Sequence, residues 1–434
     1  MQTNRYKGLA LSLGLLVTAA ASAQTEQDEQ IVAPVIDDEN PAYEVQQIET
    51  DDSVCLAGDS TVLTMPWPQN VQAKLNRLVD HPMFETSQLG MMVYDLTADS
   101  AIFRHNERQM MRPASTMKVI TAITAIDRLG GSFQFRTSLQ YTGSVMGNTL
   151  NGRLYCVGGF DPLFNIDDMK AFIEGIRQMG VDTIRGAIVA DKTMKEKDSL
   201  GTGWCWDDKN PILSPLLVSR KDNFVSRLVD ELHDAGIVVE AVLEEGKAPE
   251  EAFVICTRFH TIDQVLMKML KDSDNLFAES MFYQIAASTD QRTATAKQAR
   301  AVIRRLVERV SPSTSLCKIA DGSGLSLYNY ISPEIEIGML RYAFRNSPIY
   351  LHLYNALPVA GEDGTLKSRM RGTDAQGNVR AKTGTLTGIS SLAGYLTAAN
   401  GHTLCFCIIN QGVMNGKYGR QFQDRVCQTL CETF

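Results

Sequence analysis

Three short motifs that could do chemistry follow one another along this chain of 434 residues. They are Ser115-Thr116-Met117-Lys118, Ser273-Asp274-Asn275 and Lys382-Thr383-Gly384-Thr385. A serine hydroxyl becomes a good nucleophile only when a positioned base removes its proton. A lysine amine can do this when burial or a nearby positive charge lowers its pKa. The three motifs in this order indicate an active site that attacks a carbonyl carbon with a serine.

The residues around Ser115 predict that it lies at the start of a helix. Pro113 suits a first helical turn and Gly130 suits a helix end. Between them, apolar residues recur at spacings of three and four: Val119, Ile120, Ile123, Ile126 and Leu129. Because positions i and i+3 are neighbours on a helix, the Lys118 amine would reach the Ser115 hydroxyl, and the Ser115 N–H would be available to a developing oxyanion. The alternative is an ordinary helix start with a surface lysine.

The second motif is predicted to lie in a short break between two helices. Two residues apart in a non-helical stretch, Ser273 and Asn275 can point into one cleft. There the hydroxyl can relay a proton, and the amide can both donate and accept hydrogen bonds. The alternative is that the motif only caps the helix that follows it.

The third motif is predicted to lie on a strand near the end of the chain. Gly384 has no side chain, so a substrate backbone could approach this strand closely and pair with it. Lys382 would bring positive charge, and the hydroxyls of Thr383 and Thr385 suit a terminal carboxylate. The Thr385 N–H could be a second oxyanion donor. The alternative is a lysine on a strand next to a turn.

The trio is typical of penicillin-binding proteins and class A β-lactamases. Three further stretches carry a closer resemblance: Val157-Gly-Gly-Phe-Asp161-Pro162, Asp321-Gly-Ser-Gly-Leu-Ser326 and the run from Leu357 to Leu366. With them the chain resembles the low-molecular-mass class C penicillin-binding proteins, the D-alanyl-D-alanine carboxypeptidase/endopeptidase family of the penicillin-binding protein 4 type (serine peptidase family S13). The resemblance extends from about residue 85 to about residue 410.

The resemblance implies a serine D-Ala-D-Ala carboxypeptidase that needs no cofactor or metal. Ser115 would be acylated by peptidoglycan stem peptides ending in D-Ala-D-Ala, with Lys118 as the base. Ser273 would pass the proton to the leaving amine, and Asn275 would hold the substrate amide. Water would then hydrolyse the acyl-enzyme.

The same resemblance implies how substrate and inhibitors bind. Lys382, Thr383 and Thr385 would bind the free carboxylate beside Gly384, and the Ser115 and Thr385 amides would form the oxyanion hole. β-Lactams mimic the peptide and should form a long-lived ester on Ser115. Cleavage of the terminal D-alanine and cleavage of D-Ala cross-links use the same site, so the sequence leaves their balance open, as it does the oligomeric state.

The spacing of the motifs departs from the family pattern. Only residues 119–272 separate Lys118 from Ser273, whereas the best-known members have a longer stretch with two inserted domains. We therefore expect one inserted domain to be missing or much reduced.

The N-terminus predicts export. Arg5 and Lys7 precede an apolar run, and Ala21-Ser22-Ala23 fits a cleavage site, so residues 1–23 are predicted to be a signal peptide cleaved after Ala23. The run is too short for a comfortable membrane span. The enzyme would therefore act in the periplasm or otherwise outside the inner membrane, where its cell-wall substrate lies.

An acidic leader follows the signal peptide. Residues 24–52 contain ten Asp or Glu and no Lys or Arg, and residues 24–60 are interpreted as a disordered linker. Since the whole chain has a net charge of −8, the remainder is close to neutral. Nothing in it indicates binding to nucleic acid or to an anionic membrane.

The order of the remaining elements predicts an α+β fold. Strand-like runs near both ends of the chain favour an antiparallel sheet flanked by helices, as in serine β-lactamases and DD-peptidases. Residues 61–134 and 251–434 would form this discontinuous penicillin-binding domain. Residues 135–250 would form a smaller inserted α/β domain, with helices at about 166–179 and 223–235.

The nine cysteines of an exported chain raise the question of disulfides. Cys405 and Cys407 share one strand face, and Cys427 and Cys431 share one helix face, so a bridge is conceivable. Buried free thiols are the favoured interpretation. The six scattered histidines form no His-Glu-x-x-His or similar cluster, which argues against a zinc peptidase.

Two alternatives to a carboxypeptidase remain. A β-lactamase needs a dedicated group that activates water for fast deacylation, and no Glu-x-x-x-Asn-type element lies between the first two motifs. A catalytically silent peptidoglycan-binding or β-lactam-sensing protein is the other, and the intact motif residues argue against it.

Overall fold

The computed structural model describes residues 65–205, 210–289, 293–311 and 316–432. The predicted signal peptide and the acidic linker up to residue 60 lie outside these ranges. Among the helices in the described ranges, none combines the length and hydrophobicity required to cross a bilayer.

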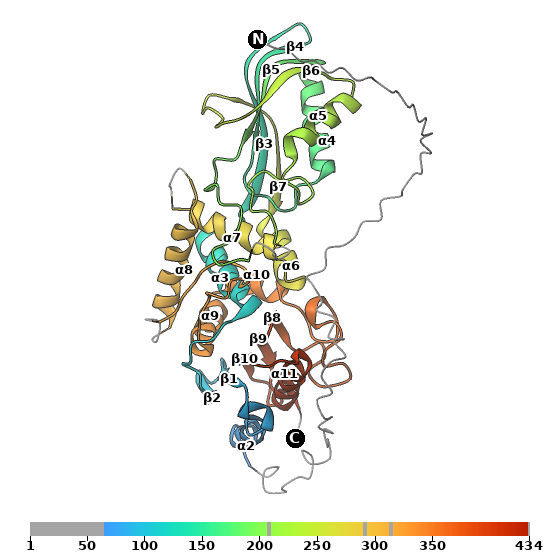
Figure 1. Ribbon diagram of the computed structural model, residues 1–434. Coiled ribbons are helices and arrows are strands. Elements are labelled where there is room, and N and C mark those ends of the chain that lie inside the picture. The colour runs from blue at the N-terminus through green and yellow to red at the C-terminus, as the bar shows by residue number, and fades with distance from the viewer. Residues whose placement is uncertain (1–64, 206–209, 290–292, 312–315, 433–434) are drawn as a thin grey trace, which may run out of the picture. The chain divides into compact units, whose positions relative to one another are not determined.

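The first sheet joins both ends of the chain, as predicted. Its five strands are antiparallel and follow the order β2-β1-β10-β9-β8 (Figure 1). Their bounds are Gln88–Asp95 (β1), Ser100–His105 (β2), Arg380–Leu386 (β8), Ile389–Thr397 (β9) and Thr403–Gln411 (β10). The third motif lies on β8 at one edge of this sheet. Among the described residues, the outer side of β8 makes only an isolated bridge, between Arg380 and Val359, and pairs with no further strand.

Helices cover both faces of the first sheet because its strands alternate between two cores. Phe406 and Ile408 of β10 pack in the core shared with α11, whereas Cys405 and Cys407 pack in the core shared with α3 and α9. This alternation follows from the period of two in a strand. The helices around this sheet are α2 (Gln69–Val79), α3 (Met117–Leu129), α6 (Ile262–Lys271), α7 (Asn275–Ala287), α8 (Ala296–Val310), α9 (Pro333–Arg345), α10 (Ser347–Ala356) and α11 (Gly416–Cys431).

The second sheet lies between the first and second motifs in the chain. Its order is β6-β5-β4-β3-β7, with β4, β5 and β6 parallel and β3 antiparallel to both of its neighbours. The strand bounds are Gln134–Met146 (β3), Thr149–Val157 (β4), Thr183–Asp191 (β5), Val238–Glu245 (β6) and Phe253–Thr261 (β7). Two helices at the predicted positions, α4 (Ile166–Gln178) and α5 (Phe224–Asp234), share its hydrophobic core.

The α+β fold class is therefore confirmed. Strand β7 extends the second sheet beyond the predicted boundary at residue 250, because it pairs with the whole first half of β3. The division into two domains stays a prediction, as does the loss of a second insertion.

The cysteines in the described ranges are free, and most of them are buried. Burial raises the pKa of the Cys405 thiol and leaves it an uncharged packing group. The interpretation of Cys405, Cys407, Cys427 and Cys431 as free thiols is confirmed, and Cys55 lies outside the described residues.

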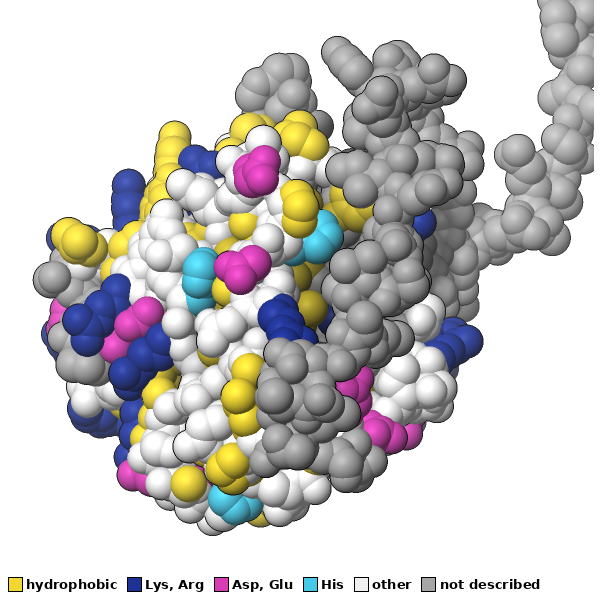
Figure 2. Space-filling model, turned by 90° about the horizontal axis from the view of Figure 1, so that it is seen from below, with side chains coloured by type: hydrophobic (Ala, Val, Ile, Leu, Met, Phe, Trp, Pro, Cys, Tyr) yellow, Lys and Arg dark blue, Asp and Glu magenta, His cyan; other side chains and the backbone are white. Residues whose placement is uncertain are grey.

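Charges of both signs lie on the face of the molecule that Figure 2 shows. On the face in Figure 2, basic and acidic side chains are interspersed with polar and hydrophobic ones. The described residues on this face therefore present no continuous field of one charge that would attract a polyanion.

Candidate active site

Ser115 lies in a tight turn directly before the long buried helix α3. The turn is a single 3₁₀ turn over Ala114–Thr116, and α3 begins at Met117 and ends before Gly130. The predicted helix is confirmed, with the difference that Ser115 precedes its α-helical part. In a 3₁₀ turn residues i and i+3 lie almost above each other, so Lys118 Nζ still lies 3.0 Å from Ser115 Oγ.

Two fixed acceptors hold the amine of Lys118. Nζ lies 2.7 Å from Asn275 Oδ1 and 2.8 Å from the backbone oxygen of Ser323, and the Lys118 side chain is fully buried. A neutral amine has two hydrogens and one lone pair. If the hydrogens go to these two acceptors, the lone pair faces the Ser115 hydroxyl, which is the orientation that a base needs.

Burial also favours the neutral form of the Lys118 amine. Desolvation lowers the pKa of Lys118 to about 8, against the opposing effect of the carboxylates of Asp321, Asp274 and Glu279. About a tenth of the amine is therefore unprotonated at pH 7, far more than for an exposed lysine.

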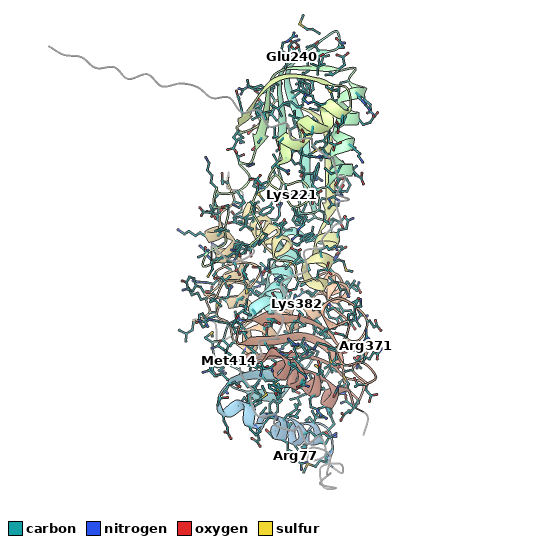
Figure 3. The ribbon with its side chains drawn as sticks, turned by 45° about the vertical axis from the view of Figure 1, so that its right-hand side comes forward. Arg77, Lys221, Glu240, Arg371, Lys382 and Met414 are labelled. Atoms are coloured by element: carbon teal, nitrogen blue, oxygen red, sulfur yellow. The ribbon has the colours of Figure 1, made fainter. Side chains whose placement is uncertain are left out.

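Ser273 of the second motif contacts the lysine of the third. Lys382 Nζ donates to Ser273 Oγ at 2.7 Å and to its neighbour's carbonyl, Thr383 O, at 2.6 Å. Burial, followed by the charge of Lys118, lowers the pKa of Lys382 well below its usual value. Lys382 lies buried on β8 (Figure 3). Its donation leaves the Ser273 hydroxyl hydrogen for another acceptor.

Close packing at Gly384 brings β8 against the serine turn. A Cβ at residue 384 would lie 3.0 Å from Ser115 N, 2.7 Å from Pro113 O and 2.1 Å from Ser391 Oγ. Any side chain here would collide with the turn. The glycine therefore lets the edge strand and the Ser115 N–H face the same space.

The threonines flanking Gly384 lie closer to solvent. Thr385 is exposed, and Thr383 Oγ1 donates to Thr365 Oγ1 at 2.8 Å. These hydroxyls lie beside the free edge of β8, where an extended peptide could pair. Thr365 was not predicted, although it belongs to one of the stretches that carry the family resemblance.

Asp274, the middle residue of the second motif, caps α7. Its carboxylate accepts from Leu276 N at 2.9 Å and from Phe277 N at 3.5 Å. The capping alternative is thus correct for Asp274, and it coexists with the contacts that its neighbours Ser273 and Asn275 make with the two lysines.

Arg220 binds the same carboxylate from the other side. This residue follows the second sheet's strand β5 and donates to both Asp274 oxygens, at 2.7 and 3.3 Å. Bidentate pairing with a partly buried carboxylate fixes its orientation. The segment between the first two motifs therefore contacts the candidate site directly, which the sequence did not predict.

Removing the ion pair between Arg220 and Asp274 should slow acylation without unfolding the protein. We expect Arg220→Met and Asp274→Asn each to reduce the rate of acylation by benzylpenicillin about fivefold, because a partly exposed pair is worth about 1 kcal/mol. The asparagine keeps the capping oxygen. Stopped-flow acylation and thermal melting would measure both effects.

The double variant and a control distinguish coupling from general damage. Arg220→Met/Asp274→Asn should be no slower than either single variant, since both remove one interaction. Arg185→Met breaks the exposed pair with Glu240 on the second sheet and should leave acylation unchanged. Independent, multiplying effects would contradict the positioning role of Arg220.

Two more residues contribute to the candidate site, and the spacing of residues in the sequence did not predict them. Ser323 acts through its backbone oxygen, which every residue has, and Glu279 is an acid inside an apolar helix. Glu279 Oε1 accepts from Gly322 N at 3.0 Å and Ser323 N at 2.8 Å. It therefore fixes the loop that presents the Ser323 carbonyl to Lys118.

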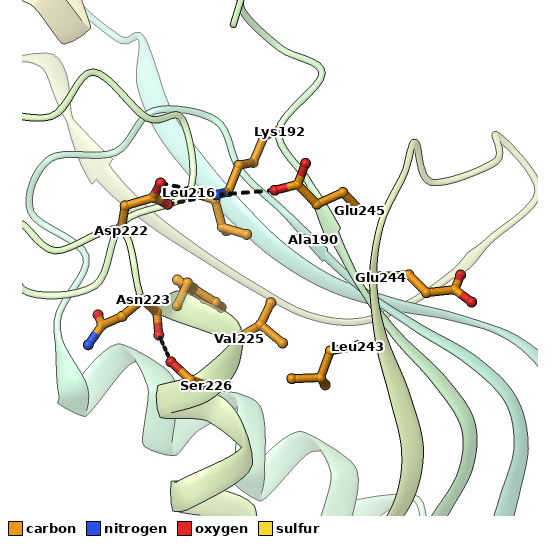
Figure 4. A pocket seen from close by; sticks show the side chains of 11 residues that line it. Ala190, Lys192, Leu216, Asp222, Asn223, Val225, Ser226, Leu243, Glu244 and Glu245 are labelled. Atoms are coloured by element: carbon orange, nitrogen blue, oxygen red, sulfur yellow. Dashed lines mark hydrogen bonds and ion pairs between the residues drawn. The ribbon is translucent and has the colours of Figure 1, made fainter. Parts of the chain in front are cut away.

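A separate cavity of about 270 Å³ lies between the ends of β5 and β6 and the start of α5 (Figure 4). Lys192 there pairs with Asp222 at 2.8 Å and Glu245 at 3.7 Å. The cavity shares no residue with the candidate site and holds no nucleophile-base pair.

Within the described ranges, no group of three His, Cys, Asp or Glu side chains is arranged to bind a metal.

Comparison with known proteins gives a family match over most of the chain. Residues 71–217 and 217–432 match the D-Ala-D-Ala carboxypeptidase 3 (S13) family. The D-alanyl-D-alanine carboxypeptidase DacB of Haemophilus influenzae is 24% identical over 417 residues, which cover 76% of this chain and 87% of the relative. A D-alanyl-D-alanine carboxypeptidase from an Actinomadura species is 26% identical, with 82% and 84% covered.

Solved structures share the fold. The crystal structure of penicillin binding protein 4 from Haemophilus influenzae has a TM-score of 0.75 at 23% identity and covers 82% of this chain and 98% of its own. A predatory peptidoglycan endopeptidase from Bdellovibrio bacteriovorus has a TM-score of 0.55 at 18% identity, with 79% and 92% covered.

Proposed function

Since the chain belongs to the D-Ala-D-Ala carboxypeptidase 3 (S13) family and is a serine-type D-Ala-D-Ala carboxypeptidase, we propose that it removes the terminal D-alanine of peptidoglycan stem peptides through an acyl-enzyme on Ser115. The observation that carries this assignment is the contact of Lys118 Nζ with Ser115 Oγ at 3.0 Å, while two acceptors hold the same amine. The relatives named above are carboxypeptidases. None of them is named as a silent binding protein or as a β-lactamase.

In the acylation step, neutral Lys118 removes the proton of Ser115 as Oγ attacks the carbonyl carbon of the penultimate D-alanine. Negative charge then develops on the carbonyl oxygen. The N–H groups of Ser115 and Thr385 stabilise this charge as the oxyanion hole. One donor of this kind is typically worth about 2.7–4 kcal/mol of barrier.

Breaking the peptide bond requires a proton on the leaving amine. Ser273 is suited to supply it because Lys382 donates to its oxygen and leaves its own hydrogen free. Ser273 then regains a proton from the lysines behind it. The leaving group departs as D-alanine, and water hydrolyses the ester with Lys118 again as the base.

Substrate binding uses the free edge of β8. A peptide pairing there as an extra strand would place its carboxylate beside the hydroxyls of Thr383 and Thr385, with Lys382 behind them. The Asn275 amide oxygen faces Lys118, so its NH₂ group is available to a substrate carbonyl.

β-Lactams are the expected covalent inhibitors because they present the same carbonyl and carboxylate. A related penicillin binding protein 4 has been solved as a β-lactam complex, and a Bdellovibrio endopeptidase of the same fold as a penicillin G acyl-enzyme. We also infer export: the predicted signal peptide would bring the enzyme to its cell-wall substrate outside the inner membrane.

The direct test is the release of D-alanine from a synthetic stem pentapeptide. We expect the purified protein to release one D-alanine from a peptide ending in D-Ala-D-Ala and no L-alanine from the matched peptide ending in L-Ala-L-Ala. Absence of release, together with absence of a penicillin adduct, would contradict the proposal. Cross-linked muropeptides in the same assay would measure the endopeptidase activity that uses the same site.

A further inference from the structure

A second buried carboxyl group, Glu336, lies behind the serine turn and has no part in the proposed chemistry. We propose that Glu336 is a positioning residue: its protonated carboxyl group anchors the Pro113–Thr116 turn that presents Ser115. This proposal rests on the proposed role of Ser115 as nucleophile. Glu336 contacts neither the substrate space nor Ser115 itself, and it acts through Thr116.

The turn needs anchoring because its backbone is strained. Ala114 has φ +49°, in the left-handed region that side chains other than glycine rarely adopt. Such residues persist only where their surroundings enforce the conformation. Gly324 lies so close that a Cβ at that position would be 1.8 Å from Ala114 O.

Hydrogen bonds to one carbonyl hold the turn from two sides. Ser391 Oγ of β9 donates to Pro113 O at 2.6 Å, and Thr116 Oγ1 lies 3.0 Å from the same oxygen. Thr116 Oγ1 also lies 3.0 Å from Glu336 Oε2 of α9. Thr116 is therefore the link between the turn and Glu336.

Counting hydrogens favours a proton on Glu336. The Thr116 hydroxyl has one hydrogen, whereas Pro113 O has none to give. If Thr116 donates to Pro113 O, its contact with Glu336 is a hydrogen bond only when Glu336 supplies the hydrogen. An ionised Glu336 would leave one of the two contacts as repulsion between oxygens.

The surroundings favour the protonated form. Glu336 is completely buried, and its other oxygen, Oε1, has no hydrogen-bond partner among the described residues. A buried carboxylate with a bare oxygen is strongly disfavoured. Burial accordingly raises the pKa of Glu336 to about 8.

Two titratable groups act on Glu336 from the strands beside it. The Cys407 thiol of β10 lies 3.6 Å from Oε2, and the more distant Lys382 of β8 favours the ionised form when it is charged. Thr116, from the serine turn, does not titrate. Alkaline pH should therefore ionise Glu336 and loosen the turn.

The experiment compares Glu336→Gln with Glu336→Met. Glutamine can donate its amide hydrogen to Thr116, so we expect it to retain acylation by benzylpenicillin within about threefold at pH 7. Methionine fills the space without a donor and should slow acylation about 10- to 100-fold, the effect of a misplaced reacting group. Thr116→Val should act like Glu336→Met, and the double variant should be no slower than either.

The pH profile separates positioning from mere packing. Acylation by the unmodified protein should rise as Lys118 loses its proton and fall as Glu336 ionises, whereas Glu336→Gln should rise to a plateau up to pH 10. Equal slowing by Gln and Met, or an alkaline fall that survives in Glu336→Gln, would overturn the proposal. If Glu336→Met does not fold, the profile of Glu336→Gln decides alone.

The experiments distinguish a failure of the Glu336 proposal from a failure of the proposed function. If the unmodified protein forms no adduct on Ser115, the assignment of the nucleophile fails. If it forms the adduct and the Glu336 variants match it in rate and profile, only the positioning role fails.

Discussion

Replacing Ser115 with alanine is expected to abolish covalent labelling by benzylpenicillin and to lower D-alanine release by about 10⁴- to 10⁶-fold, as when the nucleophile of a catalytic unit is removed. Alanine has no oxygen to form the ester. The fold should persist, because Ser115 is only partly buried and, among the described residues, its side chain hydrogen-bonds only with Lys118.

Intact-protein mass spectrometry would follow the adduct over time, with peptide mapping to locate it. Ser132→Ala is the matched control, since Ser132 is an exposed serine in the loop after α3, and it should label at the normal rate. A covalent adduct formed by Ser115→Ala at the normal rate would show that another residue is the nucleophile.

Replacing Lys118 with methionine is expected to slow acylation about 10²- to 10⁴-fold, the usual contribution of a general base. Methionine keeps most of the buried volume but has no lone pair to accept the Ser115 proton. Lys118→Arg should be about as slow, because arginine stays protonated in proteins. A fast Lys118→Arg variant would mean that charge rather than basicity matters.

The pH dependence has a defined sign for Lys118. Its pKa in the folded protein is about 8, so the acylation rate should rise with pH on the acid side of this value as the fraction of neutral amine increases. The rate of Lys118→Met should lack this rise. Stopped-flow acylation between pH 6 and 10 would test both, with Lys170→Met, an exposed lysine paired with Asp167, as the control.

The same shift predicts a stability effect. Because the pKa of Lys118 is lowered from 10.5 to about 8 on folding, the unfolded chain binds more protons between these values. The free energy of unfolding should therefore rise with pH in this window through Lys118. Thermal melting should show a smaller rise in Lys118→Met. An identical pH dependence of the two melting temperatures would contradict the lowered pKa.

The sequence alone determined the features that depend on local spacing. The i, i+3 relation brought Lys118 to Ser115, the apolar period of three and four predicted α3, and the strand-like runs near both ends of the chain predicted β1, β9 and β10. These patterns can be read along the chain because helix and strand periods are properties of the backbone. The three motifs and the family resemblance then fixed the reaction class.

Only the tertiary structure decided how distant residues act on the site. It brought Asn275 and the Ser323 carbonyl to Lys118, turned Lys382 towards Ser273, and joined Arg220 to Asp274. Such contacts join residues far apart in the sequence, and no local period encodes them.

The protonation states were also decided by the fold. Lys118 and Glu336 both have pKa values near 8 because the packed protein removes water from them, and desolvation disfavours the charged form of an acid and of a base alike. In the unfolded chain both groups would titrate at ordinary values. Desolvation exists only once helices and sheet enclose these groups, so the sequence predicted Lys118 as the base, whereas only the fold lowers its pKa.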